Sequence, residues 1–103
     1  MAATDVIKTS LERNWGMVDR AVEGLDDATL TRQINDQTNS IAWLLFHMNR
    51  VVDVFTNTRL RAKPQLWATD GWCEKFGLSD DPETTGQGWS AERLVAWTPP
   101  SKD

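Results

Sequence analysis

Two long segments of this chain carry apolar residues at α-helical spacing, and they constrain its fold more than any other feature. In the first segment the apolar positions recur every three or four residues: Ile7, Leu11, Trp15, Val18, Val22 and Leu25. Such spacing makes one apolar stripe along a helix. Thr4 and Asp5 offer N-cap chemistry, and Gly24 suits a C-terminal stop. The interior Gly16 is compatible either with close approach of a neighbour or with simple tolerance.

The second amphipathic segment begins at Asn39 and Ser40, which offer an N-cap, and we predict a helix from there to about Ala62. Its stripe consists of Ile41, Leu44, Leu45, Met48, Val51, Val52 and Phe55. Basic residues at positions 59, 61 and 63 suit the negative end of the helix dipole. Pro64 should end the helix, because the residue before a proline avoids the α region. Between the two helices we predict a short helical turn after Asp26 and then a loop.

Residues 64–103 differ in composition, since they hold all four prolines, four of the six glycines and four of the six tryptophans. We predict an irregular but packed excursion, followed by a short helix from Ser90 through Trp97. The sequence from Gly86 to Ala91 matches a loosened dinucleotide-binding fingerprint, but no strand precedes it, so Ser90 is better interpreted as an N-cap. Tryptophans need substantial packing surface and indicate a core or an interface.

The sequence therefore predicts a single all-α domain over residues 1–103. Two amphipathic helices cannot enclose a core, because helix bundles normally need three or four helices. We therefore expect this chain to be a C-terminally incomplete half of a domain, completed by a missing portion or by a partner, with a homodimer as the expected assembly.

The charge and the apolar runs exclude several classes of partner. The formal charge is −4, which does not favour nucleic acid or an anionic membrane. The longest apolar run, residues 41–46, is far shorter than the roughly 18 residues that span a bilayer. The N-terminus lacks the pattern of a secretory signal. A single cysteine, Cys73, fits a reducing compartment. We expect a cytoplasmic protein that binds neither nucleic acid nor membrane.

His47 is the only histidine and lies inside the most apolar segment. Spacing alone favours a packed or hydrogen-bonded side chain, because a metal site needs three or four donors. Asp53 falls on the far side of the predicted helix from the apolar stripe, where we expect it to be solvated. Cys73 lacks any recognisable activating motif, so a small, partly buried structural thiol is favoured over a nucleophile.

Three stretches of the sequence carry a family resemblance: TNSIAWLLFHMNRV, PQLWATDGWCEKFGL and DDPETTGQGWSAERL. Together they resemble the actinobacterial branch of the DinB-like superfamily, which includes relatives of mycothiol-dependent metalloenzymes. The resemblance runs from about residue 5 to residue 103. Its most specific parts are the opening N-S-I-A-W-L before the histidine and a loop with the residues Trp67, Gly71, Trp72, Phe76, Gly77 and Leu78.

The resemblance implies an up-and-down four-helix bundle, of which this chain supplies the first two long helices and a Trp-rich connecting loop. In that family a histidine of the second helix binds a divalent metal, zinc or nickel, together with two histidines late in the fourth helix. His47 matches the first ligand, and the matching pair is absent, so residues outside this chain would complete the site. Trp43 and Val51, each one turn from His47, are expected to line the pocket. Cys73 stands where family loops more often carry a small residue.

The function implied by the resemblance is that of a metal-dependent enzyme acting on a small molecule. It would be a transferase or isomerase that depends on a low-molecular-weight thiol such as mycothiol. An alternative belongs to another class: a non-catalytic helical dimerisation domain that retains the fold without a complete metal site.

Overall fold

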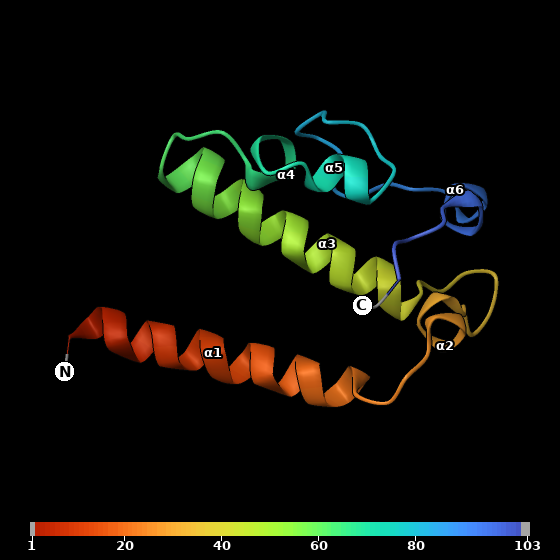
Figure 1. The fold of residues 1–103 in the computed structure, drawn as a ribbon, viewed down its shortest axis with the longest axis horizontal. Coiled ribbons are helices and arrows are strands. Elements are labelled where there is room, and N and C mark those ends of the chain that lie inside the picture. Colours follow the sequence, from red (N-terminus) through yellow and green to blue (C-terminus); the bar gives the residue numbers. More distant parts are fainter. Residues whose placement is uncertain (1, 102–103) are drawn as a thin grey trace.

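The computed structural model describes residues 2–101, and every regular element in that range is a helix (Figure 1). The two long helices are α1 (Ala3–Val22) and α3 (Ile41–Asp53), and α3 continues into the π-helical segment η1 (Val54–Leu60). The four short helices are α2 (Asp27–Thr31), α4 (Leu66–Thr69), α5 (Trp72–Lys75) and α6 (Ala91–Ala96). The predicted all-α class, the two long helices, the turn after Asp26 and the short final helix are confirmed.

The start of α1 differs from the prediction, whereas its end agrees. Ala2, not Thr4 or Asp5, occupies the N-cap position. The Asp5 carboxylate instead accepts a hydrogen bond from the Ala2 backbone N–H at 3.1 Å, so its charge still lies in the first turn, where the helix dipole favours an anion. The helix ends at Val22, and Gly24 adopts a left-handed φ of 79° as a C-terminal stop requires.

The second long helix begins as predicted and ends two residues early. The Ser40 hydroxyl accepts from the Trp43 N–H at 3.1 Å. At the other end the Arg61 N–H reaches back five residues to the Thr56 carbonyl at 3.2 Å. Ala62 then takes a left-handed φ of 51°. The helix therefore widens into π turns and ends at Leu60, where a left-handed residue soon follows. It ends before the steric effect of Pro64 applies.

An aromatic cluster around Phe46 of α3 forms the core. The Phe46 ring centroid lies 5.1 to 5.7 Å from four other aromatic rings, which belong to Trp67, Phe76, Trp89 and Trp97. Cys73 is buried in the same cluster, as expected of a structural thiol. Every partner of Phe46 comes from residues 67–97, so the irregular excursion is packed, as the sequence predicted.

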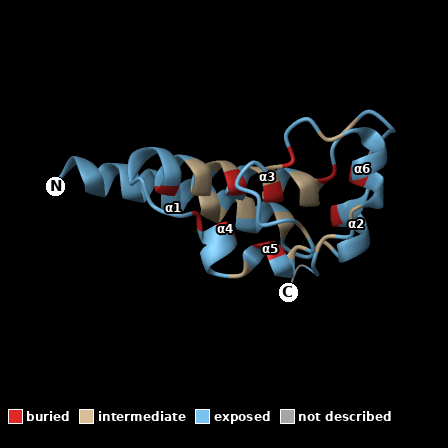
Figure 2. Ribbon diagram, turned by 90° about the horizontal axis from the view of Figure 1, so that it is seen from above, coloured by how far each residue is buried: buried red, intermediate tan, exposed pale blue. Residues whose placement is uncertain are grey.

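The excursion covers one side of α3, and α1 lies along the opposite side, antiparallel to α3 (Figure 1). No residue of α1 is buried, whereas α3 carries buried positions facing the excursion (Figure 2). Gly16 meets only the Arg20 side chain, at 3.6 Å from where a Cβ would lie, so within the described residues it is simply tolerated. None of the described helices combines the length and apolar character required to cross a bilayer.

Candidate functional site

The ring of His47 is held by one hydrogen bond that defines its protonation. Its Nδ1 lies 2.7 Å from the backbone carbonyl oxygen of Thr85, which is 38 residues away in the sequence. A carbonyl oxygen can only accept, so Nδ1 must carry the proton and donate it. In the neutral imidazole this leaves Nε2 with a free lone pair. That tautomer can bind a metal ion through Nε2 or accept a proton there.

The flat face of the same ring is fixed by Trp43, one turn earlier on α3. The two rings stack with centroids 4.7 Å apart and planes inclined by 13°. The indole Nε1 of Trp43 is buried and has no hydrogen-bond partner within residues 2–101. An unsatisfied buried donor costs about 1–3 kcal/mol, so other contacts must hold the indole in place.

Gly86 accounts for the position of that indole. A Cβ at residue 86 would lie 2.8 Å from Trp43 Nε1 and 3.2 Å from an atom of the Phe46 ring. Gly86 also has a φ of 85°, which L-residues with a Cβ rarely adopt. The backbone therefore packs directly against the aromatic side chains of α3, and only glycine permits this approach.

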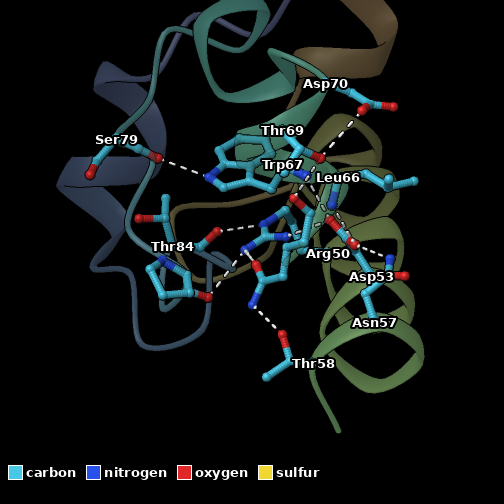
Figure 3. A network of polar contacts seen from close by, with 12 residues as sticks. Arg50, Asp53, Asn57, Thr58, Leu66, Trp67, Thr69, Asp70, Ser79 and Thr84 are labelled. Carbon is cyan, nitrogen blue, oxygen red and sulfur yellow. Dashed lines mark hydrogen bonds and ion pairs between the residues drawn. The ribbon is translucent and has the colours of Figure 1, made fainter. Parts of the chain in front are cut away.

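Beside the histidine, a buried cation is surrounded by oxygen atoms (Figure 3). Arg50 is 3% exposed, and its guanidinium donates to the carbonyl oxygens of Thr84 at 2.8 Å and Pro82 at 3.1 Å and to the Gln65 side chain at 2.7 Å. It also lies 4.5 Å above the Trp67 ring. Burial lowers the pKa of Arg50, and the negative charge of Asp53 counteracts that effect.

The predicted solvated position of Asp53 is wrong. Its side chain is 13% exposed and pairs with Arg50 at 3.3 Å. Its two oxygens also accept from the backbone N–H groups of Leu66 and Trp67 at 3.0 and 2.8 Å and from Asn57 at 2.7 Å. The excursion covers the side of α3 that carries Asp53. The Asp53 carboxylate on α3 therefore caps the N-terminus of α4.

A cavity of about 970 Å³ lies between α2, α3, the α4–α5 region and residues 98–101. Arg50 and Asp53 contribute to its wall, together with apolar side chains that include Leu45 and Leu66. His47, Trp43 and Val51 do not line it. This cavity is therefore not the pocket predicted around His47. Trp43 contacts the histidine elsewhere on α3, and Val51 lies one turn after it. A pocket lined by Trp43 and Val51 stays a prediction.

The side chains available as ligands determine whether the described residues can bind a metal ion by themselves. His47 presents the tautomer that a ligand requires, with its second nitrogen already paired. Across the part of the chain that the structure describes, no group of three or more His, Cys, Asp or Glu side chains is placed to bind a metal. His47 therefore fits as one ligand, and these residues do not complete the site around it.

Sequence reasoning missed Thr85, Gly86 and Arg50. Thr85 acts through its backbone carbonyl, which no side-chain pattern can reveal. Gly86 was visible in the sequence only as part of a false dinucleotide-binding fingerprint. Arg50 stands in the middle of an apolar helix, and a cation at such a position could have suggested a buried partner.

Comparison with protein families gives one match. A family model described as the DinB superfamily matches residues 10–98. This agrees, at the level of the superfamily, with the resemblance in the sequence. No curated protein matches the chain.

Proposed function

Because the chain belongs to the DinB superfamily, we propose that it is a metal-dependent enzyme domain in which His47 supplies one metal ligand through Nε2. The superfamily includes metal-dependent enzymes. The observation that supports this role is the hydrogen bond from His47 Nδ1 to the Thr85 carbonyl. Metal-binding histidines almost always donate their other ring N–H to a carboxylate, a carbonyl or water, which fixes the tautomer and raises the basicity of the ligating nitrogen.

The remaining ligands would come from outside residues 1–103, as the resemblance implies. A bound divalent cation, zinc or nickel, would act as a Lewis acid and lower the pKa of a coordinated thiol or water. His47 contributes a neutral nitrogen donor held in one orientation by Trp43 and Thr85. We propose a transferase or isomerase reaction on a small molecule, with a low-molecular-weight thiol of the mycothiol type as co-substrate.

The metal content of the purified protein tests the ligand assignment. Native mass spectrometry and elemental analysis should find about one divalent ion per chain of the intact protein, and His47→Ala should lose it while retaining its helical circular dichroism. Asn49→Ala is the matched control, because Asn49 is an exposed polar residue two positions away on α3. Equal metal content in His47→Ala and the wild type would refute the assignment.

A second candidate function, a non-catalytic dimerisation domain, is favoured by the exposed apolar residues of the long helices. Val6, Ile7 and Leu11 form the α1 face. Leu44, Met48 and Val52 of α3, with Phe55 at the start of η1, form the α3 face. The accessible surface is 7693 Å², whereas about 5,900 Å² is typical of a compact monomer of 11.7 kDa. The excess is about 1,800 Å² for one chain, more than the roughly 800 Å² that each partner buries in a standard-size interface, and corresponds to the larger interfaces of obligate dimers, which bury about 2,000–5,000 Å² over both partners. A second copy covering these faces would bring the chain to ordinary compactness.

The two candidates differ in what His47 does. If the protein only dimerises, His47→Ala changes neither metal content nor assembly, whereas substitutions on the apolar faces abolish assembly. If it is an enzyme, metal content depends on His47. Both properties can be read from the same native mass spectra.

A further inference from the structure

We propose that residues 82–86, which we call the 82–86 loop, are the positioning element of His47, and that Gly86 is the residue that seats this loop. The loop would determine which nitrogen of His47 carries the proton and which way the ring faces. The effect of this loop on metal affinity rests on the proposed function, but its effect on the histidine itself does not.

Two successive carbonyl groups of the loop bind two side chains of α3. The Thr84 carbonyl accepts from Arg50 Nε at 2.8 Å, and the Thr85 carbonyl accepts from His47 Nδ1 at 2.7 Å. His47 and Arg50 are three residues apart, so they are neighbours on one helix surface. Because Arg50 is buried and also holds the Pro82 carbonyl, it fixes the loop at its first half. The carbonyl that meets His47 is then one residue from an anchored position.

Gly86 fixes the second half of the loop. Its Cα side packs against Trp43 and Phe46 so closely that a Cβ would overlap the indole at 2.8 Å. Trp43 in turn stacks on His47. The same close approach therefore sets both contacts of the imidazole, the ring face through Trp43 and the Nδ1 edge through the neighbouring Thr85 carbonyl.

Gly88 provides a matched comparison within the same region. It also has a positive φ, 77°, but no atom lies within 4 Å of the place where its Cβ would be. Substituting alanine at either position strains the backbone in the same sense. Only substitution at Gly86 adds a clash with the aromatic side chains that hold His47, so the difference between the two variants isolates the close approach.

The tautomer of His47 is the primary measurement, and it requires no metal. We would record long-range ¹H–¹⁵N spectra of the intact, chelator-treated protein at about pH 8.5, where an ordinary imidazole is neutral, and assign the His47 signals by comparison with His47→Ala. The wild type and Gly88→Ala should show the Nδ1–H tautomer. Gly86→Ala should show a mixture of both tautomers, as in a free imidazole.

Three outcomes would overturn the proposal: an Nε2–H tautomer in the wild type, an unchanged Nδ1–H tautomer in Gly86→Ala, or an equal loss in Gly88→Ala. If Gly86→Ala does not fold, the double variant Trp43→Phe/Gly86→Ala removes the indole Nε1 and should regain the fold. The wild-type spectrum decides the tautomer in either case.

Titration of the intact metal-free protein with Zn²⁺ alone gives the second readout. Loss of such a supporting hydrogen bond typically lowers metal affinity by about 10–100-fold, so we expect that loss in Gly86→Ala and less than about threefold in Gly88→Ala. If the wild type binds no Zn²⁺, the proposed metal function fails while the tautomer result stands. If the wild type binds Zn²⁺ and Gly86→Ala binds it equally well, the positioning role is refuted.

Discussion

At the scale of single residues, the pair Arg50 and Asp53 determines how the excursion attaches to α3. Arg50 gathers three acceptors from residues 65–84, and Asp53 accepts from the first two backbone N–H groups of α4 (Figure 3). Each partner compensates the buried charge of the other. Removing one partner leaves an uncompensated charge and unpaired N–H groups away from water. The resulting loss of stability is far larger than the loss from breaking an ion pair on the surface.

Asp53→Ala should therefore destabilise the protein by about 3 kcal/mol, measured as the free energy of unfolding in urea. The matched control is Asp36→Ala, because Asp36 is an exposed aspartate in the loop before α3 and should change stability by less than about 0.5 kcal/mol. Similar losses in the two variants would show that the carboxylate of Asp53 is not a buried anchor.

At the scale of elements, side-chain caps decide where the helices begin. Asp26, Ser40 and Ser90 each accept from the backbone N–H three residues later, at 2.8 to 3.1 Å. These are local interactions, which explains why the starts of α2, α3 and α6 could be predicted. The end of η1 depends instead on a widened helix, for which the sequence carries no comparable signal.

The cap of α3 should matter more than the cap of α6. Ser40 is buried, so water cannot replace its hydroxyl, and Ser40→Ala should cost about 1 kcal/mol of unfolding free energy. Ser90 is exposed and makes the same bond to a six-residue helix, so Ser90→Ala should cost less. Equal costs in urea unfolding would contradict the role of burial.

The cap of α2 should make stability depend on pH. Hydrogen bonds from the Thr29 side chain and its backbone N–H hold the pKa of Asp26 below its ordinary value of 3.8. A lowered folded-state pKa gives stability that is present above the unfolded value and lost as the pH falls through the folded one.

The stability of the wild type relative to Asp26→Asn should accordingly be constant above about pH 5 and decline below about pH 4. Thr29→Val removes the larger cause of the shift and should weaken the decline. Urea unfolding at several pH values measures this dependence. A difference in unfolding free energy between wild type and Asp26→Asn that stays the same at every pH would refute the prediction.

At the scale of the whole molecule, the chain is open. Its radius of gyration is 15.1 Å, whereas about 13 Å is usual for a domain of this length. The core belongs to α3 and the excursion, and α1 adds no buried residue to it. The α1 face and the α3 face are therefore exposed, and the dimer proposed above would cover them.

Disruption of either face should prevent assembly if a second copy covers it. Ile7→Glu and Met48→Glu should each convert a dimer of the intact protein to a monomer in size-exclusion chromatography with light scattering. Ile34→Glu is the control, because Ile34 is 85% exposed and lies outside both faces. A wild type that is monomeric, or face variants that assemble normally, would count against self-association.

The sequence by itself determined the helices, because apolar spacing and capping are local properties encoded within a few residues of one another. It also determined that the tryptophan-rich excursion would pack, since rings of that size need a core. For His47, local pattern favoured a hydrogen-bonded residue and family resemblance favoured a ligand; the structure shows the hydrogen bond, and the ligand role stays a proposal.

Only the tertiary structure decided which groups meet His47 and Asp53. The Thr85 carbonyl lies 38 residues from the histidine, and the α4 backbone lies 13 and 14 residues from the aspartate. Helical position alone placed Asp53 in solvent, because a helix pattern identifies the apolar face but not what covers the polar one. Backbone carbonyls carry no sequence signature, so contacts through them arise only when the chain has folded and Gly86 allows two segments to touch.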